Sequence, residues 1–106
     1  MKKQCNIKIL APAQRELDEI AIIHKELIGS VSARKITNRI YDALEKLEIF
    51  PEMGVLCKDK NLAAAGYRIL ICENYLCFYR LINDCIYVYH IVDGRSNYPK
   101  LLSDLR

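Results

Sequence analysis

Apolar positions in the first part of the chain predict a short strand followed by an amphipathic helix. Between Gln4 and Leu10, apolar and polar residues alternate with the period of a strand. A helix is expected from Pro12 to Gly29, with Glu16 and its acidic neighbours largely on the solvent side. Its apolar stripe has three- and four-residue spacing and consists of Leu17, Ile20, Ala21, His24, Leu27 and Ile28.

A second helix is predicted directly after the first. Ser30 or Ser32 is suited to cap its start, and Pro51 requires it to stop near Phe50, because proline disfavours helical geometry in the preceding residue. The apolar stripe is Ala33, Ile36, Ile40, Ala43, Leu44 and Leu47. Two helices joined by a few residues form an antiparallel hairpin.

The second half of the chain has the pattern of an antiparallel meander. After a long loop over residues 51–66, three runs rich in β-branched and aromatic residues follow: Tyr67 to Cys72, Tyr75 to Leu81 and Cys85 to Val92. Short polar segments between the runs suit tight turns. The stretch from Tyr98 to Leu105 is compatible with a short helix or a loose tail.

This order of elements predicts an α+β fold with two layers. A strand, a helical hairpin and a three-stranded antiparallel meander bury most apolar surface if the hairpin covers one face of the sheet. An antiparallel sheet can leave its other face toward water. We therefore expect a single domain over residues 1–106, with its functional residues on the uncovered face of the sheet.

Charge limits the kinds of partner that the chain can bind. The formal net charge is +3, and 27% of the residues are charged. Strong non-specific binding to nucleic acid needs many phosphate contacts, so this charge is too small to support it. Any contact with RNA, or with another polyanion, must depend on a few well-placed cations.

The cysteines indicate neither a disulfide framework nor a zinc site. They are five in number and lack C-x-x-C spacing: Cys5, Cys57, Cys72, Cys77 and Cys85. No apolar stretch approaches the roughly 20 residues that span a membrane. We expect a protein of the reducing cytoplasm that needs no metal or other cofactor.

Two arginines are the first candidates for a phosphate-binding site. Arg68 lies within a predicted strand, and its guanidinium must face solvent or an anion to avoid a large desolvation cost. A structural alternative is an ion pair with Glu52. Arg95 follows Gly94 just past the last β run, where it is either a phosphate ligand or the partner of Asp93.

Two further residues could handle a proton. His90 is predicted on the same strand face as Ile86 and Val88, either as a general acid or base or as a half-buried structural histidine. Tyr98 could stack on a base or donate a proton. His24 lies on the apolar stripe of the first helix and is interpreted as structural.

Three cations are candidates for substrate contact at the rim of the site. Lys58 and Lys60 lie in the long loop before the meander, where they could contact phosphate or could be solvated loop residues. Arg80 lies in the second β run.

The order of these segments resembles the RelE/ParE superfamily, the small toxins of bacterial type II toxin-antitoxin modules. The similarity covers almost the whole chain, from the first strand and the helical hairpin to the last leucines. Its segments are residues 50–54 (FPEMG), 67–70 (YRIL), 74–80 (NYLCFYR) and 91–95 (IVDGR), followed by Tyr98, Leu101 and Leu102.

The resemblance implies a cognate antitoxin and two alternative activities. Members that are similar to RelE cut messenger RNA on the ribosome without a metal, whereas members that are similar to ParE inhibit DNA gyrase. In the first case Arg68 and Arg95 would stabilise the phosphate charge, with His90, Tyr98 or a loop lysine handling the proton. We expect the endoribonuclease, with gyrase inhibition as the alternative.

One position departs from the superfamily pattern. Many members have a histidine immediately before the glycine of the last turn, and this chain has Asp93 there. His90 lies three residues earlier. The departure leaves open a third possibility, a chain that keeps the fold and the antitoxin but has lost toxicity.

Overall fold

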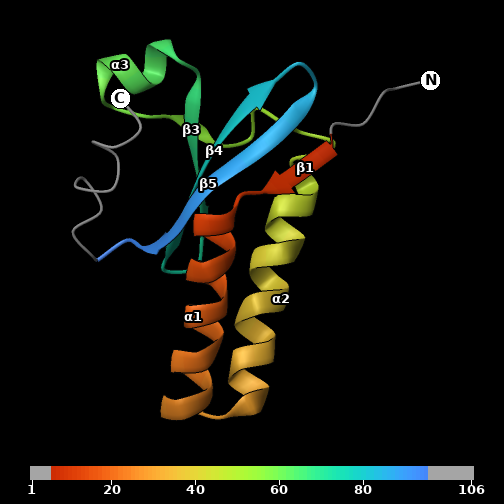
Figure 1. Ribbon diagram of the computed structural model, residues 1–106, viewed down its shortest axis with the longest axis vertical. Helices are drawn as coiled ribbons and strands as arrows, with labels where there is room; N and C mark the ends of the chain where they lie inside the picture. The colour runs from red at the N-terminus through yellow and green to blue at the C-terminus, as the bar shows by residue number, and fades with distance from the viewer. Residues whose placement is uncertain (1–5, 96–106) are drawn as a thin grey trace.

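The computed structural model describes residues 6–95, which form a five-stranded sheet and three helices (Figure 1). In sequence order the elements are β1 (Asn6–Ile9), α1 (Ala11–Leu27), α2 (Ser30–Lys46), β2 (Val55–Leu56), α3 (Lys60–Ala64), β3 (Tyr67–Cys72), β4 (Tyr75–Ile82) and β5 (Cys85–Asp93). The strand order across the sheet is β1-β5-β4-β3-β2. The predicted α+β class with a helical hairpin and a three-stranded meander is confirmed.

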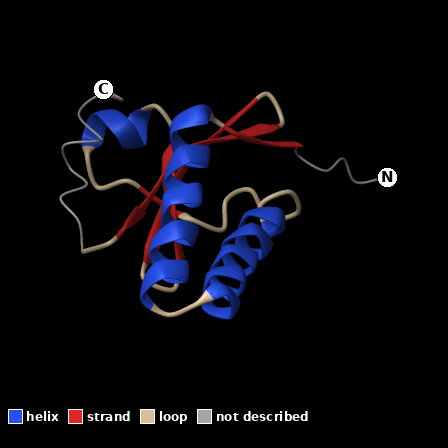
Figure 2. Cartoon of the chain, turned by 60° about the horizontal axis from the view of Figure 1, so that its bottom comes forward, coloured by secondary structure: helices blue, strands red, loops and turns tan. Residues whose placement is uncertain are grey.

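The first strand lies at an edge of the sheet and pairs in parallel with β5, from Asn6 opposite Cys85 to Ile9 opposite Val88. The remaining neighbours in the sheet are antiparallel. A parallel pair needs a crossover connection. The chain between β1 and β5 includes the helical hairpin, in which α1 and α2 lie next to each other on one side of the sheet (Figure 2).

The helical hairpin differs from its prediction at both ends of α2. Gly29 is the residue before the helix and has φ of +132°, and no side chain caps the helix there, so the expected serine cap is wrong. A glycine adopts this φ without the steric cost that a side chain would add. The helix ends at Lys46, and turns lead from Leu47 toward Pro51, so the predicted end near Phe50 was too late.

The main core lies between the helices and one face of the sheet. The helices contribute their apolar stripes, including Leu17, Ile20, Ile36 and Ile40, each at most 8% exposed. The sheet contributes alternate residues of each central strand, namely Leu70, Cys72, Cys77, Tyr79, Ile86, Val88 and Ile91. The described cysteines are not in disulfides, and Cys57, Cys72 and Cys77 are buried, so they contribute to the core as small apolar residues.

The opposite face of the sheet is partly covered, which corrects the expectation of an open face. Two elements occur in the segment predicted as a loop, the strand β2 and the short helix α3. Leu62 of α3 joins a second apolar cluster with Cys57, Tyr67, Phe78 and Val92. Asp59 caps α3 by accepting hydrogen bonds from the backbone N–H groups of Asn61 and Leu62.

A β-bulge in β5 sets which residues face the helices. The register with β4 passes from Tyr79 opposite Val88 to Phe78 opposite His90, which places Tyr89 in the bulge. A bulge adds one residue to one strand and so interrupts the alternation of its side chains. Ile91, rather than His90, therefore continues the face of Ile86 and Val88, and the predicted face of His90 was wrong.

Within residues 6–95, no helix has the length and apolar character needed to cross a membrane.

Candidate functional site

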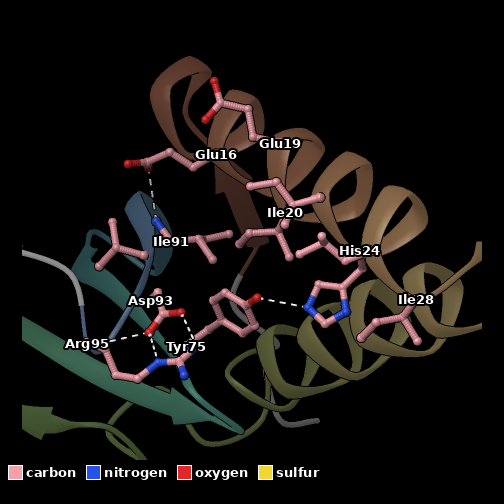
Figure 3. Close-up of a pocket in the computed structure, with 12 residues that line it drawn as sticks. Glu16, Glu19, Ile20, His24, Ile28, Tyr75, Ile91, Asp93 and Arg95 are labelled. Atoms are coloured by element: carbon pink, nitrogen blue, oxygen red, sulfur yellow. Dashed lines mark hydrogen bonds and ion pairs between the residues drawn. The ribbon is translucent and has the colours of Figure 1, made fainter.

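A cleft of about 450 Å³ lies between α1 and the ends of β4 and β5 (Figure 3). One wall is formed by α1 and the start of the turn after it, through Glu16, Glu19, Ile20, Ile23, His24, Leu27 and Ile28. The other wall comes from the sheet, through Tyr75, Ile91, Val92, Asp93 and Arg95. The cleft thus combines apolar side chains with two acids, a histidine, a tyrosine and an ion pair.

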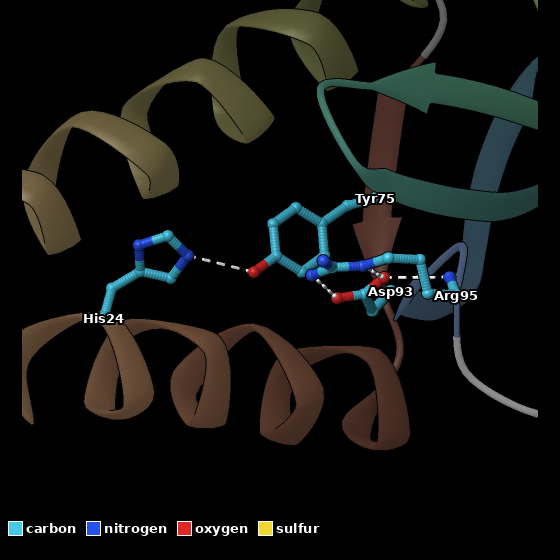
Figure 4. A network of polar contacts seen from close by, with 4 residues as sticks. All are labelled: His24, Tyr75, Asp93 and Arg95. Atoms are coloured by element: carbon cyan, nitrogen blue, oxygen red, sulfur yellow. Dashed lines mark hydrogen bonds and ion pairs between the residues drawn. The ribbon is translucent and has the colours of Figure 1, made fainter. Parts of the chain in front are cut away.

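His24 connects three elements at the edge of this cleft. Its Nε2 lies 3.0 Å from the Tyr75 hydroxyl (Figure 4). Its Nδ1 lies 3.3 Å from Oγ of Ser32. The side chain thereby ties α1 to β4 and to α2. Burial raises the pKa of Tyr75, so its hydroxyl stays protonated at neutral pH.

Arg95 forms a two-pronged ion pair with Asp93 at the exit of β5 (Figure 4). Its Nε and Nη2 donate to the two carboxylate oxygens at 3.0 and 2.8 Å, and its backbone N–H donates to Oδ1 at 2.8 Å. These hydrogen bonds from Arg95 lower the pKa of Asp93 to about 2. The arginine side chain is 80% exposed, and its charge is balanced by the aspartate.

His90 is paired with a carboxylate from α1. Its Nδ1 lies 3.1 and 3.2 Å from the two oxygens of Glu16, and the backbone N–H of Ile91 donates to Glu16 at 3.1 Å. The strand β1 ends at Ile9, opposite Val88, so Glu16 supplies an acceptor where β5 has passed the end of β1. The histidine and glutamate side chains are 14% and 22% exposed.

Arg68 binds the loop between α2 and β2. Its Nη1 donates to the backbone carbonyl oxygens of Gly54 at 2.6 Å and Glu52 at 3.3 Å. The structural alternative, an ion pair with Glu52, does not form. Arg68 does contact Glu52, but through its backbone oxygen and not its carboxylate. Arg68 lies opposite Tyr79, whose side chain belongs to the main core, so the arginine is on the helix side of the sheet and not on the opposite face.

The predicted convergence of Arg68 and Arg95 is not found. Arg68 is opposite Tyr79, whereas Asp93, the partner of Arg95, is opposite Tyr75. Four residues of a strand correspond to roughly 13 Å. The Arg68 guanidinium binds the carbonyl of Gly54, and the Arg95 guanidinium binds the carboxylate of Asp93, at different positions along β4.

Arg80 lies on the opposite face of the sheet, between two tyrosines. Its guanidinium carbon is 4.7 Å from the ring centroid of Tyr67 and 5.5 Å from that of Tyr89, and Nη2 donates to the Tyr89 hydroxyl at 2.9 Å. Contacts of this kind stabilise a cation over an aromatic face. Its Nε is buried and has no hydrogen-bond partner among the residues that the structure describes.

The remaining candidates lie apart from the cleft. Lys58 and Lys60 are exposed; Lys60 is the first residue of α3, and Asp59, between the two lysines, caps that helix. Tyr98 is outside the described residues. Over residues 6–95 no three histidine, cysteine, aspartate or glutamate side chains are grouped so as to hold a metal ion.

Comparison with known families decides the identity of the fold. Residues 7–98 match the model of a family described as the ParE toxin of the type II toxin-antitoxin system parDE. The chain belongs to the ParE toxin family. No curated protein matches the sequence.

Two solved structures share the ParE-type fold of this chain. A chain of the chromosomal ParDE toxin-antitoxin system from P. aeruginosa superposes with a TM-score of 0.72 at 21% identity, covering 87% of this chain and 98% of that one. A chain of the toxin-antitoxin complex RelBE2 from Mycobacterium tuberculosis gives a TM-score of 0.57 at 14% identity, covering 85% and 98%. At these identities the likeness establishes the fold.

Some residues of this ParE-family site could not be found from the sequence. Glu16 was assigned to the solvent side of its helix, yet it binds His90 and Ile91 across the interface with the sheet. Tyr75 was interpreted as a strand residue, and nothing in the pattern indicated its contact with His24. Asp93 and Arg95 did carry a signal, because an acid and an arginine on either side of a turn glycine can form an ion pair, which is one of the two alternatives for Arg95 in the sequence.

Proposed function

We propose that this ParE-family toxin acts by binding and inhibiting DNA gyrase, and not by cutting RNA. The family match supports a toxin of the parDE type, and gyrase is the target that the resemblance to ParE implies. The expected endoribonuclease becomes the alternative. A cognate antitoxin that neutralises the toxin is part of the proposal, because both similar structures come from toxin-antitoxin systems.

The main support for the proposal is that the predicted catalytic side chains are hydrogen-bonded to other parts of the same chain. Arg68 donates to two backbone carbonyls, His90 is paired with Glu16, and Arg95 is held by Asp93. A general base must be within hydrogen-bond reach of the proton that it removes, and a phosphate ligand must offer free donors. An RNA phosphate would have to displace Asp93 to gain Arg95, and Arg68 already uses Nη1 for the loop. His90 would have only its Nε2 for a substrate, because its Nδ1 faces Glu16.

The endoribonuclease alternative is supported by a different set of residues, on the opposite face of the sheet. Arg80 with Tyr67 and Tyr89 combines a cation with aromatic faces, and single-stranded RNA is bound by groups of this type. Lys58 and Lys60 flank the same side of the sheet through α3. Tyr67 is only 5% exposed, however, so the partly exposed Tyr89 would have to provide the stacking surface, and the arrangement does not by itself provide a group that removes a proton.

The two activities differ in the nucleic acid that is damaged. Brief induction of the toxin in growing cells, followed by analysis of DNA and RNA from the same culture, separates them. Gyrase inhibition is expected to produce DNA breaks while the 5′ ends of messenger RNA stay unchanged. A culture that also expresses the antitoxin is the control. New RNA 5′ ends within translated messages, with intact DNA, would select the endoribonuclease instead.

A further inference from the structure

The loop from Phe50 to Gly54, between α2 and β2, is held in one conformation by side chains of the sheet. The Tyr79 hydroxyl donates to the carbonyl oxygen of Pro51 at 2.8 Å and accepts from the backbone N–H of Gly54 at 2.9 Å. Arg68 donates to the carbonyl of Gly54 at 2.6 Å. The backbone N–H of Met53 closes a turn onto the carbonyl of Phe50, with Pro51 at the position that proline favours.

Gly54 lets this loop lie directly against the sheet. A Cβ at this position would be 2.7 Å from the Ile69 carbonyl oxygen and 2.7 Å from the Tyr79 ring. Tyr79 is fully buried and is among the largest buried side chains of the described core. The loop backbone is thus fixed to the core by shape and by hydrogen bonds. We call this loop together with Ile49 and the strand β2, residues 49–56, the anchored loop.

The anchored loop exposes apolar side chains although its backbone is fixed. Phe50 is 60% exposed, and the other apolar side chains that it presents are Ile49, Met53, Val55 and Leu56. Ile49, Phe50 and Met53 line an open hollow of about 480 Å³ together with Pro51 and Glu52, and Val55 and Leu56 follow in β2. A cluster of exposed apolar groups marks an interaction site, and a fixed loop binds without the entropic cost of being ordered.

The charge around the anchored loop identifies the chemistry of its partner. Residues 41–56 contain four carboxylates, on Asp42, Glu45, Glu48 and Glu52, and one lysine, and Arg68 of β3 adds a second cation at the loop backbone. Carboxylates thus remain in excess here, whereas the whole chain has a net charge of +3. A second hollow, lined by Asp42, Glu45, Lys46, Glu48 and Ile49, adjoins the first at Ile49. Negative charge repels the phosphates of RNA and DNA and attracts basic groups of a protein.

From this geometry we infer that the anchored loop binds the cellular target of the toxin, through a protein segment whose apolar side chains are flanked by lysine or arginine. The inference rests on the proposed function in that it takes the target to be a protein. It assigns Arg68 and Tyr79 as positioning residues, which act by fixing the loop and not by contacting the target.

The test replaces the exposed apolar groups and measures growth arrest. Phe50→Asp together with Met53→Asp is expected to reduce growth arrest at least tenfold at equal toxin levels, while the purified variant still unfolds cooperatively and still copurifies with the antitoxin. Val31→Asp is the matched control, because Val31 is 68% exposed at the other end of α2 and should leave growth arrest unchanged. Undiminished arrest by the double variant would overturn the inference.

A second variant covers the case in which the first one fails to fold. Glu45→Lys with Glu48→Lys reverses charge without removing apolar contacts, and it is expected to weaken growth arrest. Full arrest by this variant would contradict the basic partner. A wild-type chain that arrests no growth would also overturn the inference, because it would have no target.

Purified gyrase distinguishes this inference from the proposed function. If wild-type toxin arrests growth but leaves gyrase active, the gyrase target is wrong, and the anchored loop is judged on growth arrest alone. If the wild type and the Phe50→Asp, Met53→Asp variant inhibit gyrase equally, the gyrase target stands and the anchored loop is not its docking surface.

Discussion

At the scale of single residues, charged side chains serve as hydrogen-bond partners for the backbone. Arg68 satisfies carbonyls of a loop, and Glu16 satisfies the N–H of Ile91 past the end of β1. Buried backbone groups must find partners, and irregular segments find them in side chains. The sequence showed that Arg68 needed an acceptor, but it could not show that the acceptor was a carbonyl 14 residues away.

The ion pair between Asp93 and Arg95 predicts a specific pH dependence of stability. The pKa of Asp93 falls from its ordinary value of 3.8 to about 2 on folding. Between these values the unfolded chain binds a proton that the folded chain does not, so the free energy of unfolding should rise with pH across this window. Asp93→Asn is expected to remove this part of the rise, as measured by urea unfolding at pH 2 to 5.

Arg95→Gln provides the matched comparison for that experiment. It keeps the carboxylate but removes the guanidinium that lowers the Asp93 pKa, so it should weaken the same rise. A pH dependence in both variants equal to that of the wild type would show that the pair does not hold in solution.

At the scale of elements, long periodic segments were predictable and short ones were not. The two 17-residue helices and the strands β3 to β5 follow from their apolar periods. The two residues of β2 are too few for a period, and α3 is only five residues long. Asp59 caps α3 and is the one residue that could have indicated the start of this helix, because aspartate is common at that position. The pairing of β1 with β5 could not be predicted, because alternation identifies a strand but not its neighbour.

The hydrogen bond between Glu16 and the backbone N–H of Ile91 is expected to stabilise the edge of β5. Glu16→Ala leaves the N–H of Ile91 without its acceptor and is expected to lower the free energy of unfolding by about 1–3 kcal/mol. Amide hydrogen exchange at Ile91 should become faster. Glu19→Ala on the same helix is the control, since Glu19 is exposed and should change stability little. Equal effects of the two substitutions would contradict the role of Glu16.

At the scale of the whole molecule, the toxin presents surfaces of different character. The cleft beside α1 combines apolar walls with an ion pair, and the anchored loop at the far end of α2 carries exposed apolar groups in an acidic segment. The net charge of +3 for the whole chain does not reveal that the segment around the anchored loop is acidic. Composition argues against strong non-specific binding to nucleic acid. The local excess of carboxylates could be interpreted only once the structure placed the loop on the surface.

The most direct measurement is DNA supercoiling by purified gyrase, titrated with purified toxin and, in parallel, with the complex of toxin and antitoxin. We predict that free toxin inhibits supercoiling in proportion to its concentration and that the complex does not. Full supercoiling activity in a large excess of toxin that still arrests growth would contradict gyrase as the target.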